Sequence, residues 1–532
     1  MNSADLQAMI GQLMVCGFDG ISPSSEIIEL IREYKVGGII LFARNIGNAK
    51  EVLRLTTELQ MIAKQAGHQR PLLLCVDQEN GVVRRLGAGT TVFPGAMLLG
   101  ATGSTDNAYW TGLATGAELK ALGINWNLAP VADVNNNPRN PVIGVRSYGE
   151  DPLIVADFAW EAIRGMRAAG VITTLKHFPG HGDTDVDSHL NLPIVPYGME
   201  RLEAVELMPF KTLISRGADT IMTAHIHFPS IDGEERIPAT LSPRILTGVL
   251  REHLGYNGVV TTDCLEMHAV KNTIGTVNGA VAAIKAGADL VMISHTYDLQ
   301  KGAAIALANA VTEGGISETA LKSACERVQK LKDRYLSWKD IGNDLNSLRL
   351  PEEVGGQRHK KLAQEIYRQG VTLYRNEEAA VPVSKASSGK VLVIYPAEGN
   401  MLQVEDVQYS NCSLGKAVRE IHPSAEEFAV SGSPDAEEIL RILEKAGQYD
   451  TIIAGTLSAA QNPQQVQWVN ALLENKEKVI VVAMKSPYDI SCFHGAATYI
   501  ATFEHTYPAL CAAARLIFGL DEPKGKMPVT IL

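Results

Sequence analysis

Residues 171–177, VITTLKH, form a short run of apolar and β-branched residues that ends on a lysine and a histidine. Such a run is typical of a buried β-strand, because β-branched side chains pack well on a pleated sheet. Stretches with apolar residues at helical spacing separate it from seven similar runs, at 13–18, 36–42, 71–77, 125–131, 219–225, 258–263 and 288–294. Strands that alternate with helices predict a parallel sheet, and eight such units predict a (β/α)8 TIM-type barrel.

The character of the sequence changes after residue 340. Residues 341–355 are polar and contain Pro351 and two glycines, which indicates a linker between a barrel domain at 1–340 and a second domain at 356–532. In the second domain a helical stretch is followed by apolar runs at 371–376, 390–396, 449–456, 478–484 and 498–503. This pattern predicts a smaller α/β/α sandwich. It contains no Walker-type or GxGxxG loop, so we expect no nucleotide cofactor.

Composition narrows the possible partners. The 532-residue chain has a formal net charge of −11, which argues against nucleic acids and anionic membranes as partners. Its seven cysteines are far apart and form no CxxC pair, which is typical of reduced thiols. No lysine or arginine precedes Arg32, so the basic region of a secretory signal is missing. We therefore expect a cytoplasmic monomer that acts on a neutral or weakly charged substrate.

Polar residues close four of the predicted barrel strands: Asp77, His177, His225 and Asp263. Any one of them could be polar simply because strands lead into solvent-exposed loops. Barrel enzymes, however, assemble their active sites at the carboxyl ends of the strands. Four such residues together predict a shared site at this end of the barrel.

The segment KHFPGHGDTDVDSH, residues 176–189, gathers three histidines and three aspartates. Its aspartate spacing resembles a calcium loop, but counting from Asp183 the sixth residue is Ser188 and the twelfth is Ile194, where glycine and glutamate are required. The pair His225 and His227 could ligate a metal, but it ends the sixth predicted strand rather than the first, where barrel metallohydrolases place it. We therefore expect no metal or other cofactor.

An acid/base site explains the same residues. Asp187 and His189 are two residues apart, so an extended backbone would place both side chains on one side, where the carboxylate could orient the imidazole. Asp263 would supply a separate carboxylate, and a proton donor with a nucleophile is what two-step glycosyl transfer needs. The structural alternatives are an Asx turn at Asp187 and a helix N-cap at Asp263.

At this point the sequence strongly resembles the glycoside hydrolase family 3 β-N-acetylglucosaminidases of the NagZ type. The resemblance rests on the segments 76–86, 140–152, 176–189, 222–232, 238–246 and 258–267, and more weakly on the ending PKGKMPVTIL. It implies that Asp263 is the nucleophile and that His189, paired with Asp187, is the general acid/base. It also implies that the first sugar is held by Asp77, Arg85, Arg146, Lys176 and His177.

The resemblance implies a retaining exo-β-N-acetylglucosaminidase that removes terminal GlcNAc from muropeptides or chitin oligosaccharides, in peptidoglycan recycling. Asn80 and Val82 replace a glycine and an arginine of the family pattern, which bears on fine substrate preference. Because the dyad is present, we expect the second domain to be structural or to shape the cleft. Two alternatives stay open: a phosphorylase that uses the same residues, and a sugar-binding protein without catalysis.

Overall fold

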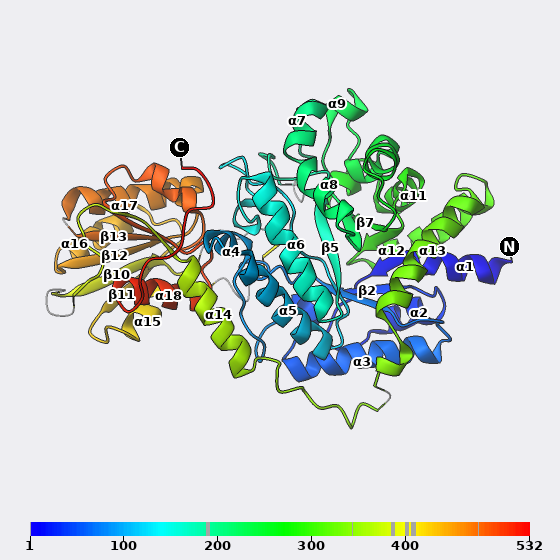
Figure 1. Ribbon diagram of the computed structural model, residues 1–532, viewed down its shortest axis with the longest axis horizontal. Coiled ribbons are helices and arrows are strands. Elements are labelled where there is room, and N and C mark those ends of the chain that lie inside the picture. The colour runs from blue at the N-terminus through cyan, green and yellow to red at the C-terminus, as the bar shows by residue number, and fades with distance from the viewer. Residues whose placement is uncertain are drawn as a thin grey trace.

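The computed structural model describes residues 2–187, 192–342, 344–384, 389–398, 404–405, 411–476 and 478–531. Its N-terminal part is a closed barrel in which eight parallel strands pair in chain order, until β8 pairs with β1 (Figure 1). The strands are β1 (Met14–Cys16), β2 (Gly38–Leu41), β3 (Leu73–Val76), β4 (Trp126–Asn127), β5 (Ile172–Phe178), β6 (Thr220–Thr223), β7 (Val259–Cys264) and β8 (Leu290–Ile293). Each predicted run overlaps one of them, and β5 and β7 extend one residue beyond the predicted end, so the predicted TIM-type barrel is confirmed.

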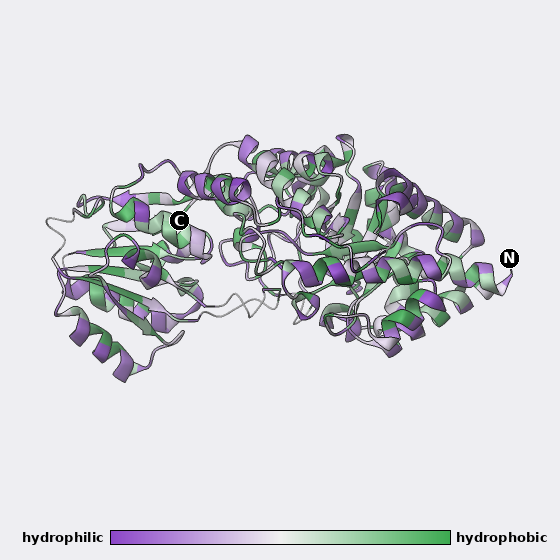
Figure 2. Cartoon of the chain, turned by 90° about the horizontal axis from the view of Figure 1, so that it is seen from below, coloured by the Kyte–Doolittle hydropathy of each residue, from purple (hydrophilic) through white to green (hydrophobic). Residues whose placement is uncertain are grey.

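The barrel strands consist largely of apolar and β-branched residues because they are buried on both faces. All residues of β3, β5 and β8 are buried. Figure 2 shows the strands mostly in hydrophobic colours and the helices with hydrophilic turns facing outward. The helices of this part are α1 (Ser3–Gly11), α2 (Ser25–Arg32), α3 (Ala49–Gln65), α4 (Ala96–Ala101), α5 (Thr105–Ala121), α6 (Pro152–Ala168), α7 (Met199–Ala204), α8 (Leu207–Ser215), α9 (Pro229–Asp232), α10 (His268–Lys271), α11 (Thr276–Ala286), α12 (Tyr297–Thr312) and α13 (Glu318–Tyr335), with the π-helix η4 (Arg244–His253) and the 3-10 turns η1 (Ala43–Asn45), η2 (Gly144–Arg146), η3 (Ala239–Leu241) and η5 (Trp338–Asp340).

The C-terminal part is a second sheet with the strand order β11-β10-β12-β13-β14-β9. Neighbouring strands are parallel except for β9, which runs antiparallel to β14 at one edge. Helices α16 and α17 lie on one face and α15 and α18 on the other (Figure 1), as predicted for an α/β/α sandwich. The elements are α14 (Gln357–Gly370), β9 (Thr372–Asn376), β10 (Val391–Pro396), α15 (Leu414–Arg419), β11 (Glu426–Val430), α16 (Ala436–Ala446), β12 (Thr451–Thr456), η7 (Ala459–Gln461), α17 (Pro463–Asn475), β13 (Val479–Ala483), η8 (Pro487–Cys492), β14 (Thr498–Ala501) and α18 (Tyr507–Ile517).

Strand β11 was not predicted from the sequence. Its residues, EEFAV, are mostly exposed or half-buried because β11 lies at an edge of the sheet and pairs only with β10. An edge strand with two glutamates lacks the continuous apolar run by which the other strands were identified. No helix in the described part of the chain is both long enough and apolar enough to cross a membrane.

A buried glutamate joins the two parts of the molecule. Glu504, which follows β14, accepts a hydrogen bond from the backbone N–H of Gly95 (2.7 Å) and another from the hydroxyl of Tyr367 (2.8 Å). A Cβ atom on Gly95 would lie 3.1 Å from Oε2 of Glu504, and one on Gly81, which has a positive φ of 59°, would lie 2.9 Å from the same oxygen. Glycine at both positions therefore lets the loop after β3 pack closely against the second domain.

Candidate active site

The carboxyl ends of the barrel strands surround a cavity of about 460 Å³. Six of the eight predicted site residues line it: Asp77, Arg85, Arg146, Lys176, His177 and Asp263. Asp187 is half-buried on the loop that follows β5 and is not among the lining residues. His189 lies outside the described residues, so its pairing with Asp187 stays a prediction.

A buried carboxylate that was not predicted organises two of these residues. Glu79 forms a bidentate pair with Arg146, with nitrogen–oxygen distances of 2.7 and 2.8 Å, and its Oε1 lies 2.6 Å from Nζ of Lys176. Burial opposes the charged form of Glu79, but Arg146 and Lys176 outweigh it, so the pKa of Glu79 lies well below its ordinary range. Lys176 also donates to Asp77 at 2.8 Å, which links four charged groups into one network.

A second carboxylate that was not predicted from the sequence forms a hydrogen bond with His177. Asp133 is completely buried; its Oδ2 lies 2.7 Å from Nδ1 of His177, and its Oδ1 accepts from the backbone N–H of His181 at 2.7 Å. Burial opposes the charged form of Asp133, but His177 and His181 outweigh it and lower its pKa. Because an ionised carboxylate only accepts, Nδ1 of His177 must donate to it. The other ring nitrogen, Nε2, then lies 3.5 Å from Arg146.

The second domain reaches the same cavity. The backbone oxygen of Val404 accepts a hydrogen bond of 2.9 Å from Nη1 of Arg85, and Val404 is one of the cavity-lining residues. Arg85 in turn lies 3.8 Å from Asp77. Next to Val404, the buried Glu405 pairs with Lys485 at 2.7 Å. The second domain thus helps to shape the cleft, one of the two roles expected for it.

Asp263 is the fifth of the six residues of β7 and lines the cavity. It belongs to β7, it is half-buried, and its Oδ1 accepts a hydrogen bond of 2.7 Å from the backbone N–H of Cys264. Helix α10 begins only at His268 and has Met267 as its N-cap. The helix-cap explanation of Asp263 is therefore wrong, because the strand continues through this residue.

The pair His225 and His227 does not form a metal site in the described chain. The ring nitrogens of His225 contact Oγ1 of Thr240 at 2.8 Å and the backbone oxygen of Cys264 at 3.0 Å. Nδ1 of His227 lies 3.4 Å from the backbone oxygen of Ile237. These contacts fix both rings within the barrel wall. Potential metal ligands come together elsewhere, at the last residue of β7 and on the loops after β7 and β8.

Comparison with known proteins places these features in a family. A model of the "Glycosyl hydrolase family 3 N terminal domain" matches residues 5–331. A protein named beta-hexosaminidase A, from Pseudoalteromonas piscicida, is 32% identical over 95% of this chain and 91% of its own length. The solved structure of a glycoside hydrolase family 3 β-N-acetylglucosaminidase from Paenibacillus sp. str. FPU-7 superposes with a TM-score of 0.93, at 40% identity over 99% of each chain. A fungal multi-domain GH3 β-N-acetylglucosaminidase superposes with a TM-score of 0.91, at 40% identity over 99% of this chain and 60% of its own.

The Glu79 network predicts a stability effect. We expect Glu79→Gln to lower the free energy of unfolding by about 3–5 kcal/mol at neutral pH, because it removes the bidentate counter-charge of the buried Arg146 and leaves Lys176 paired with Asp77 alone. The Glu79 contribution is fully present above the unfolded pKa of about 4.3 and is lost as the pH falls below it, because the pKa of Glu79 is lowered in the folded state. Urea unfolding of both proteins at pH 7 and in the acid range measures the difference.

The matched control is Glu161→Gln, which removes the same charge from a surface pair with the exposed Arg164. It should leave the unfolding midpoint nearly unchanged, since exposed pairs contribute little. Equal midpoints for the two variants would show that the Glu79 network does not stabilise the fold.

Proposed function

Because this chain belongs to glycosyl hydrolase family 3 and is a glycoside hydrolase, we propose that it is a retaining exo-β-N-acetylglucosaminidase. One observation carries the proposal: the Asp263 carboxylate lines the same cavity as the five charged or polar side chains expected to hold the sugar. The relatives named above for β-hexosaminidase and β-N-acetylglucosaminidase activity support the choice of sugar. The terminal GlcNAc unit occupies the cavity, and the rest of the substrate extends from its mouth.

Asp263 is the proposed nucleophile. Its carboxylate attacks the anomeric carbon, and the bond from that carbon to the glycosidic oxygen breaks as His189 gives its proton to the departing oxygen. His189 then takes a proton from water, whose oxygen displaces Asp263 from the sugar. Two displacements at one carbon return the β configuration. Asp187 orients the His189 ring and favours its protonated form.

The buried network supports binding of the sugar by groups that are already in place. Glu79 fixes Arg146 and Lys176, and Asp133 fixes His177, so these side chains need not reorganise when the sugar arrives. Charged side chains suit sugar hydroxyls because each can make more than one strong hydrogen bond. Asp77 and Arg85 complete the set on the side where the second domain contributes Val404.

The natural substrate that we propose is a muropeptide or a chitin oligosaccharide, processed by a cytoplasmic monomer. All seven cysteines are free in the structure, which supports a reducing compartment. In that compartment a GlcNAc-releasing enzyme would serve peptidoglycan recycling. The net charge of −11 supports a substrate other than a nucleic acid or an anionic membrane.

The stereochemistry of the first product tests the proposal most directly. Proton NMR of 4-nitrophenyl β-N-acetylglucosaminide during turnover should show β-GlcNAc before its mutarotation to the α anomer, because a double displacement retains configuration. The same spectrum should appear with and without phosphate in the buffer. Initial release of α-GlcNAc would contradict the double displacement, and accumulation of GlcNAc 1-phosphate would identify a phosphorylase instead of a hydrolase.

The nucleophile assignment predicts that Asp263→Asn lowers kcat at least about 10³-fold, since removal of a covalent nucleophile abolishes the route through the intermediate. Circular dichroism should show an unchanged fold. Asp157→Asn is the matched control, because Asp157 is exposed and pairs with Arg216 on the outside of the barrel. Turnover of Asp263→Asn at the wild-type rate would contradict the assignment.

The acid/base dyad predicts a shift in the pH profile. In Asp187→Asn the imidazolium of His189 loses its counter-charge, so the alkaline limb of kcat/KM should move to lower pH. The control is Asp185→Asn, which removes an exposed carboxylate two residues away. If both variants keep the wild-type alkaline limb, Asp187 does not tune the proton donor.

A further inference from the structure

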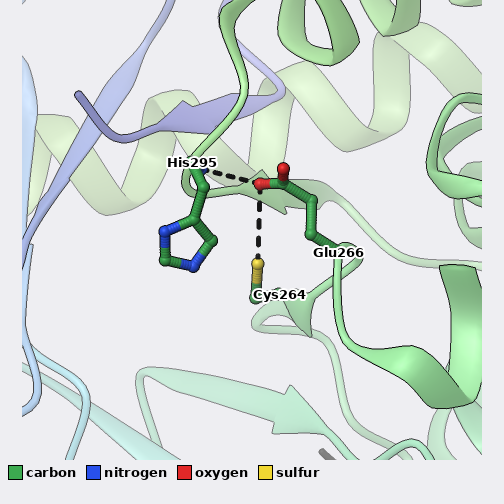
Figure 3. Close-up of side chains that lie close together, drawn as sticks. All are labelled: Cys264, Glu266 and His295. Carbon is green, nitrogen blue, oxygen red and sulfur yellow. Dashed lines mark hydrogen bonds between the residues drawn. The ribbon is translucent and has the colours of Figure 1, made fainter. Parts of the chain in front are cut away.

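Three potential metal ligands meet on the wall of the cavity, beside the proposed nucleophile. Cys264 directly follows Asp263, Glu266 lies two residues further on, and His295 lies on the loop after β8 (Figure 3). Sγ of Cys264 lies 4.0 Å from Oε2 of Glu266, and the ligand atoms of all three residues lie within 4.8 Å of one another. None of the three has a role in the proposed glycosyl transfer.

The backbone holds this cluster in place. Oε2 of Glu266 accepts a hydrogen bond of 2.7 Å from the backbone N–H of His295, and Oε1 accepts one of 3.1 Å from Thr296. The carboxylate therefore spans the loops after β7 and β8, and its Oε2 also accepts the weak S–H hydrogen bond of Cys264, which a bound metal would replace with a bond to the thiolate. The His295 ring packs against Phe42, with the ring centroids 5.2 Å apart. These contacts hold the Glu266 carboxylate and the His295 ring beside the Cys264 thiol.

The charges around the cluster allow a cation to bind. The neighbouring Arg44 is already paired with Asp19 at 2.7 Å and donates to the backbone oxygen of Ser294 at 2.6 Å. A cysteine binds a metal as the thiolate and a histidine binds it through a neutral ring nitrogen, so a bound metal would displace the proton of the Cys264 thiol.

We propose that Cys264, Glu266 and His295 form a binding site for Zn²⁺, with water as the fourth ligand. Thiolate, imidazole and carboxylate are the donors that zinc binds, whereas magnesium and calcium prefer oxygen alone. Zinc bonds of about 2.0–2.3 Å place neighbouring ligand atoms roughly 3.5 Å apart, so the donors must close by about 1 Å. Because His295 is exposed, its ring can make most of this adjustment.

Zinc at this position would inhibit turnover. The ion would lie one residue from Asp263, within the cavity that the sugar must enter. Its positive charge would attract the carboxylate that has to attack the anomeric carbon, and its water ligand would occupy space at the mouth. This inhibitory effect rests on the proposed function, whereas binding of the metal does not.

Cobalt spectroscopy tests the site independently of catalysis. The full-length protein, stripped of metal with a chelator and exchanged into chelator-free buffer, is titrated with Co²⁺. We expect one equivalent to produce the thiolate-to-cobalt charge-transfer band, and Zn²⁺ to abolish the band by competition. Cys264→Ser should remove the band, and His295→Ala should weaken binding at least about tenfold.

Matched control variants remove a cysteine and a histidine at positions away from the proposed metal site. Cys325→Ser removes a half-buried thiol from α13, and His253→Ala removes a histidine from the outer helix η4. Both should bind Co²⁺ like the wild type. Absence of the band in the wild type, or its persistence in Cys264→Ser, would overturn the proposed site.

Inhibition is measured on the same proteins, with each variant compared with its own metal-free rate. Zn²⁺ should inhibit the wild type, and half-inhibition of His295→Ala should need at least about tenfold more zinc. Equal zinc sensitivity in both would overturn the inhibitory role. If 4-nitrophenyl β-N-acetylglucosaminide is not turned over at all, the proposed function fails while the cobalt result still decides the metal site.

Discussion

The site depends on a buried carboxylate shared between two cations. Glu79 follows β3, Arg146 belongs to η2, and Lys176 lies in β5, so one side chain joins three separate segments of the barrel. Each of these groups is costly to bury alone, because water solvates a charge far better than a protein interior does. Together, the negative charge of Glu79 and the positive charges of Arg146 and Lys176 offset the cost of burying each group. The side chains proposed to bind the sugar are thereby held in place by interactions that exist before any substrate arrives.

Asp133 repeats this solution at the end of β5. It accepts hydrogen bonds from the ring N–H of His177 and from the backbone N–H of His181, so the strand end and the loop that follows share one anion. Arg85 is held differently. It donates to the backbone oxygen of Val404, which ties a residue proposed to bind the sugar to the second domain.

The sequence predicted the elements that depend on local pattern. Buried parallel strands need continuous apolar residues, and all eight barrel strands could be found for that reason. The edge strand β11 could not, because its two glutamates suit an exposed strand as well as a loop. Glu79 and Asp133 were missed although each lies just beyond a predicted strand, where the rule that identified Asp77 also applies. Glu79 and Asp133 can be buried because each pairs with residues that are far away in the sequence. Such pairs cannot be recognised from a single sequence. The cluster of Cys264, Glu266 and His295 joins two strand ends and was hidden for the same reason.

Two histidine–aspartate pairs, one observed and one proposed, differ in what they can do. His177 is buried, its Nδ1 proton is committed to Asp133, and its Nε2 faces the guanidinium of Arg146, which has no lone pair to accept a proton. Both nitrogens of this ring thus face protein groups before any substrate binds. A general acid must release a proton to the leaving group and regain one from water in every cycle. A ring whose N–H is committed to a buried carboxylate is poorly suited to that cycle, and this is the physical reason to propose binding for His177 and proton transfer for His189.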